Sequence, residues 1–218
     1  MTSTHDLINL MNLGLLLPAL MLASIPASAQ WTDLLQDKSL AGWESIGDGS
    51  WTLRGDGVLI GQKNISDKGA NQAWFYTRKE YSDFDLEFDW WLRLGGNSGV
   101  SLRDTSRAKW AITGNWDAEK TPSHIGYEIQ LSNGYKDQYL SGSVYHFDKA
   151  PDIIDHPNDW NHMRIESRKS GITVFINRKP VSHYAGDPAR SLTGPIGLQL
   201  HDRNTVVMFR DLRIHEIR

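Results

Sequence analysis

The chain alternates apolar and polar residues over several short stretches, and this alternation limits the folds open to it. The longest stretch, residues 83–93, places Phe84, Leu86, Phe88, Trp90 and Leu92 at every second position. Strand side chains point to opposite faces with period two, so each stretch predicts a strand with one buried face. Further strands are predicted at 163–167, 172–176 and 206–217, the first two joined by a glycine-containing turn. Without helical segments between them, such strands predict an antiparallel sandwich or jelly roll.

Three other predicted strands, 100–103, 127–131 and 196–201, carry a polar set opposite their apolar residues. If Val100, Leu102, Ile129, Leu131, Leu198 and Leu200 face the core, the other face holds Ser101, Arg103, Glu128, Gln130, Gln199 and His201. Arginine donates in a fixed fork, glutamate accepts or acts as a base, and histidine titrates near neutrality. The set could therefore bind a polyhydroxylated molecule and move protons. The alternative is an internal network between Arg103 and Glu128 that only orders the sheet.

Two further residues are expected to join this polar face. Asn97 lies in the Gly-Asn-Ser-Gly turn that opens one of the three strands, where glycines permit close backbone approach. Tyr145 alternates with Val144 in a short predicted strand, 142–146. Both side chains can hold hydroxyl groups.

The acidic strand offers a competing site, because Asp85, Glu87 and Asp89 share one face. Residues two apart on a strand are roughly 6–7 Å apart, and retaining glycosidases need carboxyls about 5 Å apart. However, the Asp-x-Glu-x-Asp order lacks the two glutamates that sandwich-fold glycanases use as nucleophile and acid. A solvated outer face, continued by Arg93, is the favoured interpretation.

No metal site or cofactor is predicted. The histidines are scattered, there is no HExxH motif, and the chain has no cysteine. Glu128 with His201, or His146 with Asp148, could ligate a divalent ion, but their spacing alone does not support one.

Length, charge and composition limit the kinds of partner expected for this chain. The 218 residues suit one large β domain, and a net charge of −3 without a basic run argues against nucleic acid. Nine tryptophans raise the expectation of a sugar ligand. The long connections 104–125, with Trp110 and Trp116, and 146–159 are binding loops or variable surface excursions. The oligomeric state is not predicted.

The N-terminus has the pattern of a secretory signal peptide. Residues 13–25 are apolar and Ala27-Ser28-Ala29 is a small-x-small cleavage signal, although no Lys or Arg precedes the apolar run. The run is too short for a comfortable membrane span. We therefore expect a cleaved signal at 1–29, a mature domain at 31–218 in the periplasm or medium, and no membrane attachment after cleavage.

Several ordered motifs resemble those of the 3-keto-disaccharide hydrolase family. They are Asn97-Ser98-Gly99-Val100 with Arg103, Gly126-Tyr127-Glu128-Ile129-Gln130, Ser141-Gly142-Ser143-Val144-Tyr145 and Gly197-Leu198-Gln199-Leu200-His201. The flanks agree, from Gly42-Trp43 near the start to Phe209-Arg210-Asp211-Leu212 near the end. The resemblance implies an all-β, concanavalin A-like jelly-roll sandwich in an exported bacterial protein that acts on glycosides oxidised at C3.

The implied chemistry gives the polar face a task. A 3-keto group acidifies the C2 proton, so a base can remove it, the C1 aglycone can leave, and water can then add. Glu128 or His201 would be the base, Arg103 would steady the enolate, and Asn97, Ser101, Gln130, Tyr145 and Gln199 would hold the sugar. A divalent cation could replace or assist Arg103. The sequence leaves the base and acid unassigned between Glu128 and His201.

Two alternatives remain open at this level. A non-catalytic, lectin-like carbohydrate-binding module would share the fold, and fold does not determine function. An ordinary glycanase would act on unoxidised oligosaccharides and depend on Glu87.

Overall fold

The protein is seen in a computed structural model that describes residues 30–37, 39–63, 71–132 and 138–217. The predicted signal peptide, 1–29, lies outside the described residues, so its cleavage stays a prediction. Among the residues described, no helix is long and apolar enough to cross a membrane.

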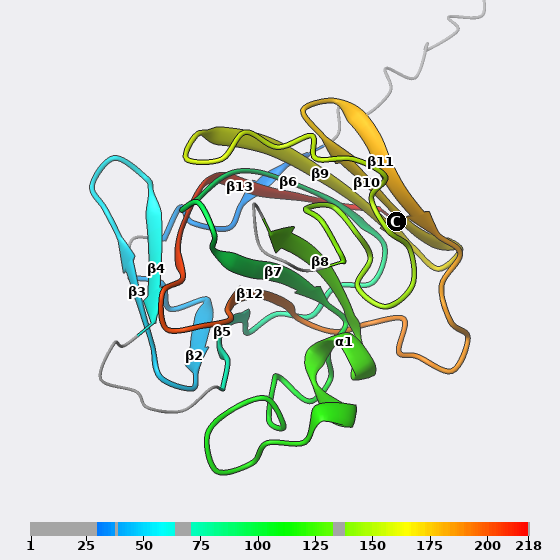
Figure 1. The fold of residues 1–218 in the computed structure, drawn as a ribbon, viewed down its shortest axis with the longest axis horizontal. Coiled ribbons are helices and arrows are strands. Elements are labelled where there is room, and N and C mark those ends of the chain that lie inside the picture. The colour runs from blue at the N-terminus through cyan, green and yellow to red at the C-terminus, as the bar shows by residue number, and fades with distance from the viewer. Residues whose placement is uncertain (1–29, 38, 64–70, 133–137, 218) are drawn as a thin grey trace, which may run out of the picture.

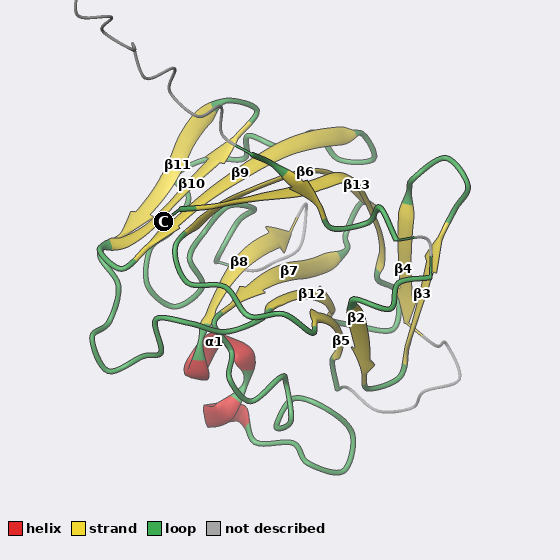
Figure 2. Ribbon diagram, turned by 180° about the vertical axis from the view of Figure 1, so that it is seen from behind, coloured by secondary structure: helices red, strands yellow, loops and turns green. Residues whose placement is uncertain are grey.

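Two antiparallel sheets form the fold (Figures 1 and 2). The larger sheet has the order β11 (Lys179–Tyr184), β10 (Gly171–Ile176), β9 (Trp160–Arg168), β6 (Phe84–Leu92), β13 (Val206–Glu216), β4 (Leu59–Lys63) and β3 (Gly49–Leu53). A short β1 (Thr32–Asp33) also pairs with β13, giving eight strands. The strands predicted from alternation at 83–93, 163–167, 172–176 and 206–217 correspond to β6, β9, β10 and β13.

The smaller sheet carries the polar residues of interest. Its order is β2 (Trp43–Ile46), β5 (Ala73–Thr77), β12 (Ile196–Leu200), β7 (Asn97–Leu102) and β8 (Tyr127–Ser132). A one-turn 3-10 helix η1 (Ala118–Lys120) and a one-turn α1 (Pro122–Ile125) lead into β8. They lie at the lower edge of Figure 1, together with the long loop that follows β7.

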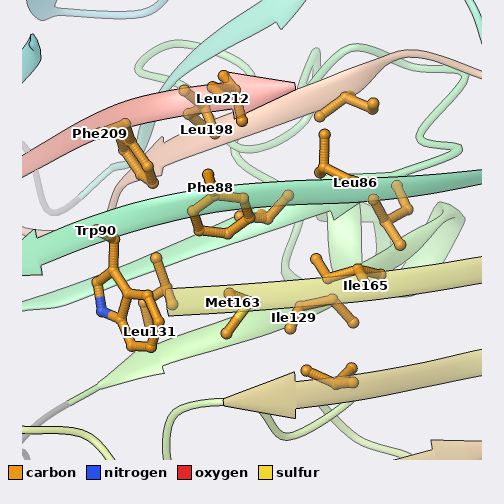
Figure 3. Close-up of a cluster of buried hydrophobic side chains, with 14 of the residues drawn as sticks. Leu86, Phe88, Trp90, Ile129, Leu131, Met163, Ile165, Leu198, Phe209 and Leu212 are labelled. Atoms are coloured by element: carbon orange, nitrogen blue, oxygen red, sulfur yellow. The ribbon is translucent and has the colours of Figure 1, made fainter. Parts of the chain in front are cut away.

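The core lies between the two sheets. Figure 3 shows Leu86, Phe88 and Trp90 from β6 facing side chains from both sheets. All eleven apolar residues that alternation assigned to the core are at most 1% exposed. Burial of this apolar surface is the main force that fixes which face of each strand points inward. The structure therefore confirms the all-β, concanavalin A-like jelly-roll sandwich.

The loop 103–121 is anchored to the outer face of the smaller sheet. The buried carboxylate of Asp104 accepts hydrogen bonds from the Tyr76 hydroxyl at 2.7 Å, the Ala108 amide at 2.7 Å and the Ser106 hydroxyl at 2.7 Å. Ala108 and Ala111 pack on Trp74 and Tyr76, which project from β5. The loop thus covers one part of this face and leaves another part open.

Candidate functional site

The outer face of the smaller sheet is hereafter the site face. It is formed by Trp74 and Tyr76 of β5, Gln199 of β12, Asn97, Gly99 and Ser101 of β7, and Glu128 and Gln130 of β8. Strand register places Ser101 opposite Glu128, and Gly99 opposite Gln130. Gln199 lies opposite Trp74 across the neighbouring pair. The polar residues of three strands therefore share one face, as their alternation predicts.

A cavity of about 250 Å³ opens on the site face. Its lining consists of Gln72, Asn97, Trp116, Thr121, Ser123, His124, Glu128, Gln130, Tyr145, His146 and His201. Five of the eight residues proposed from the sequence are among them: Asn97, Glu128, Gln130, Tyr145 and His201. The structure brings these five together, while their chemical roles stay predictions.

The floor of the cavity is buried and its walls are more exposed. Asn97, Glu128 and Gln130 are 2%, 5% and 1% exposed. The side-chain amide of Gln130 donates to the side-chain oxygen of Asn97 at 3.3 Å, and this hydrogen bond connects two adjacent strands. Below the Glu128 carboxylate lies Gly99, where an added Cβ would come within 2.7 Å of Oε1. Glycine at this position makes room for the carboxylate of the neighbouring strand.

Tyr145 reaches the cavity because its segment continues the sheet beyond β8. The backbone N–H of Tyr145 donates to the backbone carbonyl of Glu128 at 2.8 Å, and the backbone N–H of Gln130 donates to the backbone carbonyl of Ser143 at 3.0 Å. Val144 forms a bridge with Ile129. The strand expected at 142–146 is therefore present only as a short bridged segment, yet it places the tyrosine on the expected side.

Arg103 is not on the site face, and the prediction that placed it there is wrong. β7 ends at Leu102, and Arg103 has a left-handed backbone with φ of 60°, so the period-two alternation stops one residue earlier. Its guanidinium donates to the Ser82 carbonyl at 3.0 Å and lies 3.8 Å from the Asp83 carboxylate. Burial lowers the pKa of Arg103, which the charge of Asp83 opposes. The residue secures the end of the sandwich.

Ser101 and Gln199 lie on the site face but outside the cavity lining. The Gln199 amide is fully buried, and neither its nitrogen nor its oxygen has a hydrogen-bond partner among the described residues. Such a group costs about 1–3 kcal/mol. Near Ser101, burial raises the pKa of Tyr76 well above its ordinary value, and the charges of Asp104 and Glu128 act in the same direction. Tyr76 therefore stays protonated and donates to Asp104.

Part of the cavity wall, namely His124, His146 and Trp116, was not assigned to the site from the sequence, although Trp116 and His146 lie in the two connections named as candidate binding loops. The rings of His124 and His146 are 4.7 Å apart, and the His146 ring lies 4.4 Å from that of Tyr145. His146 has φ of 72°, so it does not turn to the face opposite its neighbour as a strand residue would. These residues come from irregular segments, where period-two reasoning gives no signal.

The described part of the chain holds no group of three or more His, Cys, Asp or Glu arranged to bind a metal ion. Within the cavity, the Thr121 hydroxyl lies 2.8 Å from Nδ1 of His124, which orients that ring. The polar side-chain groups of the cavity are one carboxylate, three imidazoles, three amides, two aliphatic hydroxyls, a phenol and an indole N–H.

The acidic strand lies on the outer face of the larger sheet, hereafter the charged face, which comprises Asp85, Glu87 and Asp89 of β6 with Arg164, Arg168, Arg210 and Arg213. Arg164 approaches Asp85 at 3.1 Å, Arg213 approaches Glu87 at 2.7 Å, and Arg210 approaches Asp89 at 3.0 Å. Asp85 also pairs with Arg168. The outer-face interpretation agrees with this placement, although arginines rather than water cover Asp85 and Glu87.

Comparison with known proteins agrees with this architecture. The sequence profile of a family described as the 3-keto-alpha-glucoside-1,2-lyase-like domain matches residues 30–215. The chain belongs to this family. Membership connects the protein to carbohydrate chemistry and supports an enzyme that acts on glycosides. No curated protein matches the sequence.

Solved structures similar to this member of the family establish the fold. A protein from Parabacteroides distasonis, provisionally named a glycosyl hydrolase, is 23% identical with a TM-score of 0.67, over 86% of this chain and 100% of that one. A galectin-like protein of unknown function from Bacillus subtilis is 14% identical, with a TM-score of 0.56, over 86% and 94%. The carbohydrate-binding module CBM66 from Bacillus subtilis is 18% identical, with a TM-score of 0.50, over 80% and 96%.

Proposed function

We propose that the protein cleaves 3-keto-glycosides, including 3-keto-disaccharides, by elimination followed by hydration. The observation that carries the proposal is that Glu128 of β8 and His201, the residue that follows β12, line one cavity with Asn97, Gln130 and Tyr145. A carboxylate and an imidazole in one small cavity supply the base and acid that this reaction needs. Family membership supports a C3-oxidised sugar as the substrate in this proposal.

In the first half of the reaction, Glu128 or His201 removes the proton from C2. The C2–H electron pair forms the enolate with the C3 carbonyl, and the C1–oxygen bond then breaks as the C1–C2 double bond forms. The departing aglycone oxygen takes a proton from the other of the two residues. In the second half, water adds to C1 and a proton returns to C2, so the net change is hydrolysis.

The enolate oxygen needs a hydrogen-bond donor, and Arg103 cannot be this donor because its side chain does not line the cavity. Among the donors in the cavity lining are the imidazoles of His124 and His146 and the side-chain amide of Gln130. Preorganised donors of this kind are worth about 10²–10³ in rate when they meet the developing charge. Asn97 and Tyr145 are placed to hold sugar hydroxyls.

The decisive experiment incubates the purified protein with a 3-keto-glucoside in D₂O. We expect release of the aglycone together with deuterium at C2 of the released 3-keto sugar, because elimination breaks the C2–H bond. Aglycone release without deuterium at C2 would contradict the elimination. Binding of sugar without any turnover would favour the carbohydrate-binding alternative.

Export of the mature protein is part of the proposal and rests on residues 1–29 of the sequence alone. Sequencing the N-terminus of protein recovered from the periplasm or medium tests it. An N-terminus at Gln30 is expected, and full-length protein in the cytoplasm would contradict export.

A further inference from the structure

We propose that the indole of Trp116 is the platform on which the aglycone of the substrate stacks, so that this residue selects aglycones containing a ring with an apolar face. The inference deepens the proposed function and rests on it. Trp116 would bind the aglycone, which is the leaving group, whereas Glu128 and His201 would act on the 3-keto sugar ring.

The size of the cavity divides the substrate into two parts. A volume of about 250 Å³ is below the lower limit of roughly 300 Å³ for cavities that enclose a drug-sized ligand. One pyranose ring therefore occupies the cavity beside Glu128, and a second ring extends through the mouth. Only side chains at the mouth can contact that second ring.

Trp116 lies at this mouth. Its side chain lines the cavity and is nevertheless 49% exposed, whereas Glu128 on the floor is 5% exposed. An indole offers a flat apolar face with an N–H at its edge, which suits the alternating CH and OH groups of a sugar ring. Trp116 is the one large exposed apolar side chain among the described residues that also lines this cavity.

The backbone of the loop that carries Trp116 is anchored before any ligand arrives. Next to Trp116, the Asp117 amide donates to the Trp110 carbonyl at 2.9 Å, and the Asp117 carboxylate caps η1 by accepting from the Glu119 amide at 3.1 Å. Earlier in the loop, the Ala111 carbonyl accepts a hydrogen bond from the backbone N–H of Gln72 at 3.0 Å, which fixes the loop to the sheet. An anchored platform loses little conformational entropy on binding.

Trp110 provides a matched control from the same loop. The ammonium groups of Lys109 and Lys120 lie 4.7 Å and 5.0 Å from its ring centroid, so cations already occupy the ring. Trp110 does not line the cavity. Removing either indole changes the loop by the same number of atoms, but only Trp116 would contact an aglycone.

The experiment compares Trp116→Ala and Trp110→Ala with two substrates, a 3-keto-disaccharide and methyl 3-keto-glucoside. We expect Trp116→Ala to raise KM for the disaccharide about tenfold, the order expected of one aromatic stacking contact, and to leave KM for the methyl glycoside unchanged. Trp116→Phe should restore most of the affinity, and Trp110→Ala should change neither KM. A 3-keto-glucoside with an aryl aglycone distinguishes a preference for sugar rings from a preference for any flat ring.

An equal effect of Trp116→Ala on both substrates would show a general role in the loop and would overturn the proposal, as would no effect on either. Failure of the wild type to turn over either substrate would instead contradict the proposed function. In that case, calorimetric measurement of the binding of the same two compounds tests whether Trp116 is the stacking platform. Weakening by Trp116→Ala that is confined to the disaccharide supports it, and equal binding by wild type and variant refutes it.

Discussion

The two outer faces of the sandwich differ in how their carboxylates are paired. The charged face bears a hollow of about 880 Å³, and each of its β6 carboxylates accepts hydrogen bonds from arginine. The cavity on the site face is less than a third as large, and its described lining includes Glu128 but no arginine or lysine. A carboxylate whose lone pairs are engaged by arginine is a poor base, whereas one among imidazoles and amides can exchange protons. The smaller hollow is therefore the better candidate site.

Matched Glu→Gln substitutions on the two faces give the largest expected contrast. Glu128→Gln should lower kcat on a 3-keto-glucoside by about 10²–10⁴-fold, because the amide cannot serve as the acid or base. Glu87→Gln should leave kcat unchanged and lower the free energy of unfolding by about 1 kcal/mol, since its partner Arg213 is half exposed and screened by solvent. Loss of activity in Glu87→Gln alone would move the site to the charged face.

Gly99→Ala tests the position of the Glu128 carboxylate without removing it. The new Cβ would lie 2.7 Å from Oε1 and 3.0 Å from Cγ of Glu128, so the side chain must shift. A displacement of about 1 Å costs on the order of 10²-fold in rate. Steady-state kinetics checks this, with Gly55→Ala as the control because no atom lies within 4 Å of its added Cβ. Unchanged kinetics for Gly99→Ala would show that the carboxylate position is unimportant.

Tyr76→Phe tests whether the site face depends on its internal hydrogen bonds. The substitution removes the hydroxyl that donates to Asp104 at 2.7 Å and leaves the buried carboxylate one donor short. We expect a loss of about 1–3 kcal/mol in the free energy of unfolding, measured by urea denaturation. Tyr81→Phe is the control and should lose less, because it removes the hydroxyl of another buried tyrosine and leaves the hydrogen bond between Tyr76 and Asp104 in place. Equal losses would show that removal of a buried hydroxyl as such, rather than loss of its hydrogen bond to Asp104, causes the effect.

The smallest expected effect is a pH dependence at Asp155, away from both hollows. Burial raises the pKa of Asp155, which the hydrogen bond from Ser141 opposes. The folded state therefore favours the protonated acid, so its stabilising contribution is complete below the ordinary pKa of 3.8 and is lost as pH rises through the folded pKa. The free energy of unfolding of wild type, relative to that of Asp155→Asn, should therefore decrease as pH rises above 3.8, which urea denaturation at several pH values measures.

Asp37→Asn is the control with the opposite sign. The pKa of Asp37 is lowered by hydrogen bonds from Ser39, so its contribution is present above pH 3.8 and lost in acid. The stability of wild type relative to this variant should therefore increase with pH. The same direction of change in both variants would contradict the assignment of the Asp155 effect to burial.

Alternation predicted the long strands because each buries one face completely. The apolar residues of β6, β7, β8 and β12 fall on the core side, with the exception of Trp91 in β6. The short strands β2 to β5 were not predicted individually. β3 and β4 alternate in burial but span only five residues each, which is a short run for recognition from the sequence, and β5 is buried on both faces and shows no period of two.

The candidate site divides in the same way. Asn97, Glu128, Gln130 and Tyr145 could be placed from the sequence because they follow or extend regular strands. Arg103 could not, because a single left-handed residue ends the alternation where the sequence pattern still continues. His146 and Trp116 come from loops and His124 from the one-turn α1, and the course of the chain there depends on contacts with distant residues, such as that of Asp104 with Tyr76.

The sequence by itself determined the sandwich, the inward face of its strands and the strand residues that share the site face, because the period of two is a local property of the backbone. Only the tertiary structure decided which side chains meet in the cavity. Strand order brings β7, β8 and β12 together, a loop anchored by one buried carboxylate supplies Trp116, and the end of β7 turns Arg103 away. These depend on contacts between residues far apart in the chain, which no local pattern encodes.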